Sequence, residues 1–152
     1  MRTLGLDLGE KRIGVALSDA AGWLATPLAA LRHRSRDADL AAIEELVQRH
    51  SVQRIVVGHP ISLNGTAGSQ AKHVERFAML MREQLPVPVI LWDERLSTAH
   101  AERLIHDSGK RVRRDRIDAA AAAVILQSYL DAHSPLGDQL HPTPPSPATE
   151  ED

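Results

Sequence analysis

Apolar and polar residues alternate with a period of two at the start of the chain. From residue 4 to 8 every second position is leucine, with Gly5 and Asp7 in between, and a second alternating run spans residues 12–18. Because side chains along a strand point alternately to the two faces of a sheet, these runs predict strands over about residues 2–8 and 12–18, each with one apolar face. The short connection between them predicts a β-hairpin.

Strand and helix patterns take turns further along the chain. A third strand is predicted over about residues 23–31, at a sheet edge because Pro27 cannot donate a backbone hydrogen bond. Short apolar runs at residues 54–58 and 87–92 predict buried strands of the kind found in parallel sheets. Capping residues and apolar residues at helical spacing predict four helices. The first begins after Ser35 or Asp37 and ends near Arg49, and the second spans residues 74–85. The third runs from Ser97 or Thr98 to Gly109, and the fourth runs from about Asp115 to Leu130.

This order of elements predicts an α/β fold. Three strands come first and strands then alternate with helices, which favours a mixed five-stranded sheet with an antiparallel start and flanking helices. In such sheets, ligand sites lie beyond the carboxyl ends of the parallel strands. Residues 1–133 form one predicted domain, whereas residues 134–152 are rich in proline and acid and are predicted to be a disordered tail.

The composition narrows the chemistry that this fold can host. The chain has 152 residues and no cysteine, so a metal site would have to use oxygen or imidazole ligands. No apolar run reaches the ~20 residues that cross a bilayer, and we expect a cytoplasmic protein that does not bind membranes. Base stacking is not expected to dominate recognition, because apolar contexts predict core positions for Trp23, Phe77, Trp92 and Tyr129.

Positive charge is concentrated in two short stretches, although the formal net charge is -2. One group is Lys110, Arg111, Arg113, Arg114 and Arg116, and the other is Arg32, Arg34 and Arg36. The first group comes shortly before Asp118, so a phosphate backbone bound there would run towards that acid. A solvated loop is the simpler interpretation of such a charge run.

Three acids occupy positions where a purely structural role is awkward. Asp7 lies between leucines of a predicted strand, Glu94 follows the last predicted strand, and Asp118 lies near the start of the last helix. If they converge, their oxygens suit Mg²⁺ or Mn²⁺, and two such ions about 4 Å apart can bind the attacking water and the leaving oxygen of a phosphodiester. The sequence therefore predicts a carboxylate site for two divalent cations.

Each acid also has a simpler interpretation. Asp118 would be the third residue of a helix capped by Asp115, where an acid complements the helix dipole. Glu94 would be a solvated carboxylate paired with Arg95. Asp7 is the hardest to explain in this way, because a buried acid needs a partner or a function.

Four stretches together resemble the YqgF (RuvX) family over roughly residues 2–131: DLGEKRIGVALSD at 7–19, VVGHPISLNGT at 56–66, DERLSTAHAERL at 93–104 and KRVRRDRIDAAAAAVILQSYL at 110–130. The family belongs to the ribonuclease H-like superfamily, so the resemblance implies strand order 3-2-1-4-5 and a carboxylate-metal nuclease site. By this resemblance, Asp7, Glu94 and Asp118 match the acids of that site. The neighbouring Asp93 is the alternative to Glu94, because a shift of one residue changes which side chain points inward.

The chain departs from the family pattern at His59, where the family usually has leucine. This histidine follows the predicted strand at residues 54–58 and is a candidate for orienting water or contacting phosphate. The alternative is a simple loop histidine.

The resemblance implies a divalent-metal-dependent nuclease that matures the 5′ end of the precursor of 16S ribosomal RNA. Resolution of Holliday junctions in DNA is the alternative activity, and a non-catalytic nucleic-acid-binding module is an alternative of another class. We expect structured RNA or branched DNA as the partner, with a homodimer left open. The residues expected to bind nucleic acid are Lys11, Arg12, Arg95, Lys110, Arg111, Arg113 and Arg114.

Overall fold

The computed structural model describes residues 1–61, 68–96 and 114–133. Three parts of the sequence-based prediction lie outside the described residues: the helix from Ser97 or Thr98 to Gly109, the basic residues Lys110, Arg111 and Arg113, and the tail at 134–152. Within the described ranges, no helix is both long enough and apolar enough to span a membrane.

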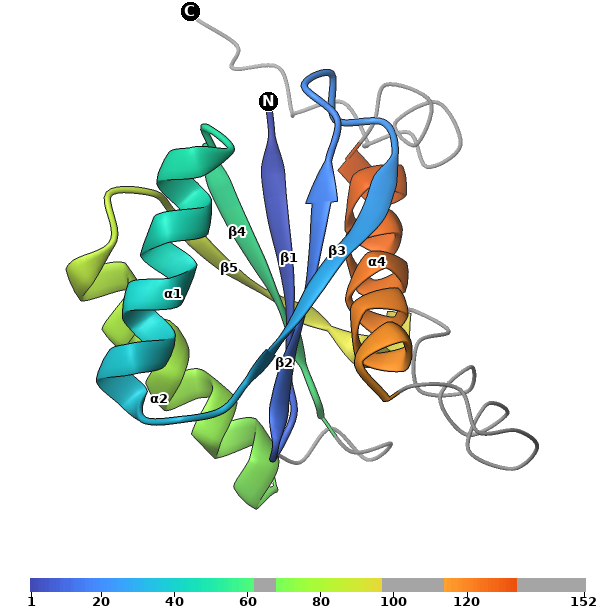
Figure 1. The fold of residues 1–152 in the computed structure, drawn as a ribbon. Helices are drawn as coiled ribbons and strands as arrows, with labels where there is room; N and C mark the ends of the chain where they lie inside the picture. The colour runs from blue at the N-terminus through green and yellow to red at the C-terminus, as the bar shows by residue number, and fades with distance from the viewer. Residues whose placement is uncertain (62–67, 97–113, 134–152) are drawn as a thin grey trace, which may run out of the picture.

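The described strands form one mixed sheet (Figure 1). They are β1 (Thr3–Leu8), β2 (Arg12–Ser18), β3 (Ala25–Arg32), β4 (Arg54–His59) and β5 (Val89–Asp93). The order is β3-β2-β1-β4-β5, with antiparallel pairs β1–β2 and β2–β3 and parallel pairs β1–β4 and β4–β5. The predicted five-stranded sheet is therefore confirmed, and its central strand β1 is buried along its whole length.

The hairpin and the edge strand follow from the residues that form them. The backbone amide of Gly9 donates to the carbonyl of Arg12 at 2.9 Å, which closes the turn between β1 and β2. β3 lies at the edge of the sheet, where the missing amide hydrogen of Pro27 is tolerated. The register between β2 and β3 shifts between Val15 and Ala16, so the strand pair that contains the proline absorbs the irregularity.

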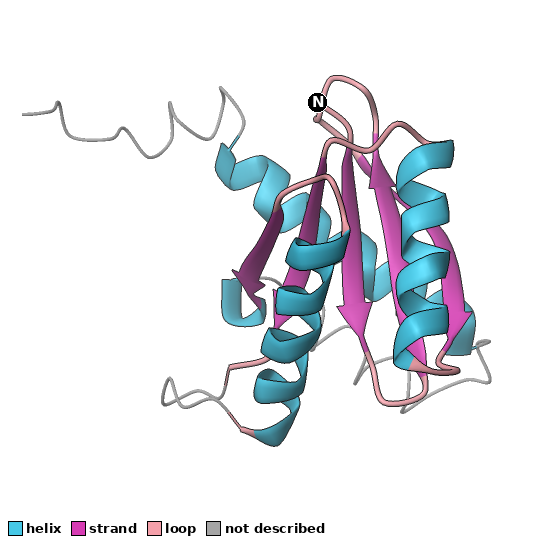
Figure 2. Cartoon of the chain, turned by 90° about the vertical axis from the view of Figure 1, so that its left-hand side faces the viewer, coloured by secondary structure: helices cyan, strands magenta, loops and turns pink. Residues whose placement is uncertain are grey.

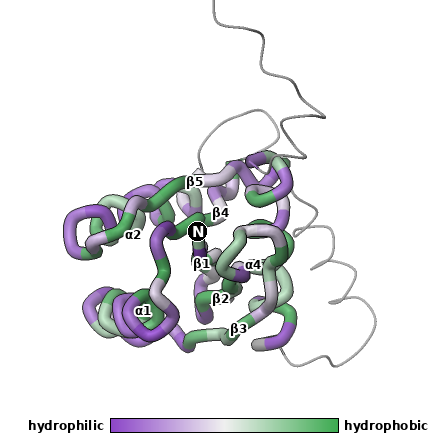
Figure 3. The backbone as a smooth tube through the Cα atoms, turned by 90° about the horizontal axis from the view of Figure 1, so that it is seen from above, coloured by the Kyte–Doolittle hydropathy of each residue, from purple (hydrophilic) through white to green (hydrophobic). Residues whose placement is uncertain are grey.

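Helices cover both faces of the sheet. α1 (Arg36–Arg49) and α2 (Ser69–Gln84) lie on one face, where Figure 2 shows them in front of the strands, and α4 (Arg114–His133) lies on the other. Seen from above, the sheet passes between these two layers (Figure 3). Ser35 caps α1 by accepting a hydrogen bond from the amide of Ala38, as one of the two predicted caps. A short 3₁₀ turn, η1 (Glu94–Leu96), follows β5 directly.

The described part of α4 begins within one residue of the predicted start near Asp115, but Asp115 does not cap the helix. The described helix begins at Arg114, so Asp115 lies inside its first turn and Asp118 lies in its second turn. The interpretation of Asp118 as the third residue of a helix capped by Asp115 is therefore wrong. A boundary inferred from one acid is uncertain by a residue or two, because the backbone hydrogen bonds decide where a helix starts.

Side-chain alternation sorts the apolar residues into clusters on the two faces. The leucines of β1 pack with residues of α1 and α2 such as Ile43 and Met81, which are fully buried. On the opposite face Val56 of β4 packs with Leu126 of α4. Because burial of apolar surface is the main favourable term in folding, these clusters hold both helical layers to the sheet.

The alanine-rich helix α4 lies close to the sheet. A Cβ atom added to Gly5 of β1 would lie 2.7 Å from the Cβ of Leu126 and 3.2 Å from the carbonyl oxygen of Ala122. Real Cβ atoms essentially never approach other atoms within 3.0 Å. The contact therefore requires glycine on the strand, and small residues on the helix allow the two backbones to approach.

The prediction that all four aromatic residues lie in the core is wrong for Trp23. Phe77 and Tyr129 are buried and Trp92 is partly buried, but Trp23 is 51% exposed. Trp23 precedes β3 in the β2–β3 connection, where its amide donates to Oδ1 of Asp19 at 2.7 Å. A turn at the end of a sheet carries side chains beyond the cover of the helices, and an apolar local sequence does not reveal this.

Candidate functional site

Asp7 lies near the carboxyl end of β1, on the face that α4 covers. Its side chain is only 5% exposed, so it is a buried carboxyl group. Its direction follows from the alternation of side chains in the strand. Gly5, two residues earlier, has α4 against the position of its missing Cβ, and residues two apart point to the same face.

Both strands beside β1 carry a glycine at the level of Asp7. Gly14 of β2 is the direct cross-strand partner of Asp7. On the other side Leu6 pairs with Val57 of β4, so the next step of this parallel register brings Asp7 beside Gly58. We call Gly14, Asp7 and Gly58 the central row. It crosses the middle of the sheet and carries a single side chain.

Glu94 reaches the central row from the end of β5. Its Oε1 atom lies 2.8 Å from the position that a Cβ of Gly58 would occupy, and its Cγ atom lies 3.2 Å from that position. Cδ1 of Ile125 in α4 lies against the same point at 2.8 Å. The carboxylate of Glu94 is therefore on the α4 face, and a side chain at position 58 would displace it.

Asp118 reaches the central row from α4. A Cβ atom on Gly14 would overlap the backbone oxygen of Asp118 and would lie 2.6 Å from its carbonyl carbon. The first turns of α4 lie at the end of the sheet where β1, β4 and β5 have their carboxyl ends (Figure 1). The structure thus brings Asp7, the carboxylate of Glu94 and the backbone of Asp118 to one row, on one face, at one end of the sheet.

The chemistry of these three residues fits a hard divalent cation. They offer carboxylate oxygens, which Mg²⁺ and Mn²⁺ prefer, and the glycines on either side of Asp7 allow Asp118 and Glu94 to approach the central row. Among the described residues, no group of three or more histidine, aspartate or glutamate side chains is already arranged to hold a metal ion. Metal binding by the three acids stays a prediction.

Asp93 and Glu94 are directed to opposite faces of the sheet. Leu91 packs with the α1–α2 cluster and Trp92 with the α4 cluster, so the alternation of β5 directs Asp93 towards α2. The carboxylate of Asp93 accepts hydrogen bonds from the backbone amide of Arg95 at 2.9 Å and from its Nη2 atom at 2.6 Å. The hydrogen bonds from the Arg95 side chain hold the pKa of Asp93 below its ordinary value. Of the two alternatives, Glu94 is the one that borders the central row.

His59 also points away from the central row. It is the last residue of β4, and its Nε2 atom lies 2.9 Å from Oε1 of Glu75 in α2. Gly58, its neighbour in the strand, faces α4 instead. The structure therefore does not bring His59 to the three acids, and this histidine is a strand residue and not a loop residue.

The cations predicted to bind nucleic acid differ in their surroundings. Lys11 is exposed in the β1–β2 turn, and Arg12 is half-buried at the start of β2. Arg12 lies two residues before Gly14, so it points to the face of the central row. Arg95 is held in the ion pair with Asp93. Arg114 is the first described residue of α4.

Sequence reasoning identified the three acids but missed the two glycines of the central row. Gly14 and Gly58 look like ordinary small residues in strands. The available signal was the alternation of side chains along each strand. Gly14 lies two residues from Ala16, and Gly58 lies two residues from Val56, so each glycine shares a face with a residue that packs against α4. A glycine on a helix-covered face often marks a close approach of another chain segment.

Two solved structures define the class of fold. The chain resembles Thermus thermophilus RuvC in complex with a Holliday junction substrate, with a TM-score of 0.57 and 16% identity over 87% of this chain and 94% of that chain. It also resembles the Thermus thermophilus RuvC structure, with a TM-score of 0.55, 16% identity, and coverage of 87% of this chain and 95% of that chain. Together with the strand order, these likenesses show a ribonuclease H-like fold.

The sequence comparisons show the family. The family model "RuvX: Holliday junction resolvase" matches residues 1–132, and the chain belongs to this family. A relative from Caldanaerobacter subterraneus subsp. tengcongensis is 46% identical over 135 residues, which cover 87% of this chain and 97% of the relative. A relative from Moorella thermoacetica is 49% identical over 133 residues, which cover 86% of this chain and 95% of the relative. Both bear the name "Putative pre-16S rRNA nuclease".

Proposed function

We propose that this protein is a divalent-metal-dependent nuclease that hydrolyses phosphodiester bonds of RNA during maturation of the 5′ end of the 16S ribosomal RNA precursor. One observation carries the proposal: the buried carboxyl group of Asp7 lies between two glycines, with Glu94 and Asp118 at the edges of the same row. The curated relatives bear the name of a pre-16S rRNA nuclease, which favours this substrate.

The proximity of the three acids to one row supports a role in binding cations. Neighbouring carboxylates repel one another, and a divalent cation between them offsets this repulsion. Asp7, Glu94 and Asp118 would hold one or two Mg²⁺ or Mn²⁺ ions, which when bound would stabilise the negative charge that develops at the scissile phosphate and activate water.

The residues of the chain supply orientation as well as ligands. Asp7 is held by the central strand of the sheet, and Glu94 lies against Gly58, so neither acid depends on a long loop for its position. Rigid placement of reacting groups lowers the entropic part of a barrier. Arg12 and Lys11 lie at the same end of the sheet and would attract the phosphate backbone.

Resolution of Holliday junctions is the second candidate function. The family model carries this description, and it covers nearly the whole described part of the chain. A junction and a structured RNA both present phosphodiester backbones, so the central row itself does not distinguish them.

A cytoplasmic location and a homodimer stay predictions.

The test is cleavage of both substrates by the wild-type chain. We would incubate it with a 16S precursor RNA and with a four-way DNA junction, each in Mg²⁺, Mn²⁺ or EDTA. Cleavage of the RNA that requires a divalent cation is the expected result. Preferential cleavage of the junction would favour the second candidate, and binding without any cleavage would favour a non-catalytic module.

Asp7→Asn should lower the cleavage rate by roughly 100-fold or more, because it removes a charge that acts directly at the reacting phosphate. Binding measured in EDTA should change little, since the arginines are untouched. Asp37→Asn is the matched control, because Asp37 is an exposed acid in the first turn of α1 on the opposite face. Normal cleavage by Asp7→Asn would refute the proposed mechanism.

A further inference from the structure

Three arginines surround the sheet edge beside the central row. Arg12 of β2 and Arg32 of β3 are direct cross-strand partners. The register is regular from Arg12 to Gly14, so both arginines point to the α4 face, at the end of the sheet where Asp7 lies. Arg116 is an exposed residue in the first turn of α4.

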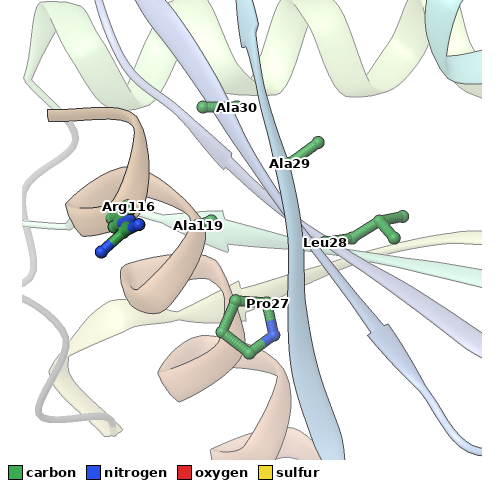
Figure 4. A pocket seen from close by; sticks show the side chains of 6 residues that line it. All are labelled: Pro27, Leu28, Ala29, Ala30, Arg116 and Ala119. Carbon is green, nitrogen blue, oxygen red and sulfur yellow. The ribbon is translucent and has the colours of Figure 1, made fainter. Parts of the chain in front are cut away.

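A groove of about 420 Å³ runs between β3 and the start of α4. Its lining residues are Pro27, Leu28, Ala29 and Ala30 of β3, and Arg116 and Ala119 of α4 (Figure 4). Ala30 is paired with Gly14, so the groove continues the central row by one strand. At ~4.8 Å between neighbouring strands, Ala30 lies about 10 Å from Asp7.

This arrangement is electrostatically unfavourable for the protein by itself. Like charges directly opposite one another in a sheet are destabilising, as Arg12 and Arg32 are. Among the residues that the structure describes, neither of them nor Arg116 forms an ion pair with an acid. The groove that Arg116 lines is largely apolar, and the exposed Pro27 points into it from β3 (Figure 4). Arginines that form no ion pair within the described part of the chain, beside an apolar groove, fit a ligand that is anionic along one side and apolar along the other.

We propose that this groove binds the sugar-phosphate backbone of the substrate strand next to the bond that is cut, and that Arg12, Arg32 and Arg116 contact its phosphates. The inference rests on the proposed function only in that the same strand reaches the three acids. It assigns binding roles to Arg32 and Arg116, and it assigns a path to the nucleic-acid strand, which leaves the central row across β2 and β3. A path in the other direction, towards the end of β5, is less favoured because Arg95 is already paired with Asp93 there.

The test is binding by single variants of the full chain in EDTA, where no strand is cut. Arg32→Ala, Arg116→Ala and the double variant would be titrated against fluorescently labelled RNA at several salt concentrations. Each single variant should raise Kd several-fold and lower the slope of log K against log salt by about 0.7 to 0.9, the value for one lost phosphate contact. Arg76→Ala is the matched control, because Arg76 is exposed on α2 on the opposite face and has no ion pair among the described residues.

A structural role would produce a different result. Arg32→Ala relieves a like-charge pair, so its Tm should not fall below that of the wild type although binding weakens. If Arg32→Ala lowers the Tm and leaves the salt slope of RNA binding unchanged, the proposal is overturned. It is also overturned if the double variant has the same salt slope as Arg76→Ala. If the variants show the expected changes in salt slope but the wild-type chain cuts no substrate in Mg²⁺ or Mn²⁺, the proposed function is refuted and the assignment of the groove still holds.

Photocrosslinking tests the path of the strand independently. Replacement of Pro27 by p-benzoylphenylalanine should give crosslinks to bound RNA, because Pro27 is exposed and its ring points towards α4 at the wall of the groove (Figure 4). The same replacement at Met79, which is 57% exposed on α2, should give none. Crosslinks from position 79 and not from position 27 would overturn the proposal.

Discussion

Asp7 is a carboxyl group in a place where the sheet carries almost no other side chains. Its direct partner in β2 is Gly14, and the parallel register sets Gly58 on its other side. A larger residue at position 14 would collide with the backbone of Asp118, and one at position 58 would displace the side chain of Glu94. At the scale of single residues, the site therefore depends as much on two missing Cβ atoms as on the acid itself.

Asp93 and Glu94 are neighbours in sequence with different surroundings. The pKa of Asp93 is lowered, first by the side-chain hydrogen bonds from Arg95, so this carboxylate is charged at neutral pH. A lowered pKa means that its pairing adds stability above the ordinary carboxyl pKa and loses this contribution as pH falls through the lowered value. Asp93 should therefore not produce a change in cleavage rate between pH 5 and 9.

Glu94→Gln should lower cleavage by roughly 100-fold, since it removes a charge at the central row. Asp93→Asn should retain most of the activity and the pH profile of the wild type, because the Asp93 side chain points to the opposite face, where it pairs with Arg95. Measured cleavage rates of the two variants over pH 5 to 9 distinguish the acids. The reverse result would assign the role to Asp93.

At the scale of elements, close approach to the sheet makes the site. α4 lies on Gly5 and Gly14, and Glu94 lies on Gly58. Each contact joins segments that are far apart in the chain, and each would be lost if the glycine carried a methyl group. The alanines at residues 119–123 serve the same purpose from the side of the helix.

Gly58→Ala should lower cleavage by roughly 10-fold or more, because its Cβ would lie 2.8 Å from Oε1 of Glu94 and from Cδ1 of Ile125. Crowding a packed position of this kind also costs about 1–3 kcal/mol of unfolding free energy. Gly68→Ala is the control, since nothing lies within 4 Å of that Cβ position. Cleavage and chemical denaturation would be measured for both variants, and equal cleavage rates would contradict the role of Gly58.

At the scale of the whole molecule, the two faces of the sheet have different tasks. The face under α1 and α2 holds the larger apolar cluster, whereas the face under α4 combines a smaller cluster with the central row. A core substitution should therefore affect activity according to the face on which it lies.

Leu126→Ala and Ile43→Ala should each lower the unfolding free energy by about 2–5 kcal/mol, because both side chains are fully buried. Below the unfolding transition of both variants, Leu126→Ala should also lower cleavage, since Leu126 holds α4 against β1. Ile43→Ala, under the opposite face, should cut at the wild-type rate. The measurements are denaturant melts and single-turnover cleavage, and a similar loss of activity in both variants would contradict the division between faces.

Much of the fold was predictable from local patterns. Alternation in β1 and β2 predicted the hairpin, and Pro27 predicted the edge position of β3. The errors have local causes as well. Trp23 was predicted to lie in the core because its neighbours are apolar, although it lies in a turn. His59 was a candidate for orienting water or contacting phosphate, and its imidazole contacts Glu75 of α2.

The sequence by itself determined the order of strands and helices, the mixed sheet and the three acids of the candidate site. The elements follow from the periodicity of apolar residues and from the hydrogen-bond donors of the backbone, which Pro27 lacks. The first acid follows from the free-energy cost of burying a carboxylate between leucines. Only the tertiary structure decided that Glu94 and not Asp93 lies over Gly58, and that Arg12 and Arg32 share a face beside a groove. The physical reason is that a side chain's face depends on local alternation, whereas its neighbours depend on the register between strands that are distant in the chain.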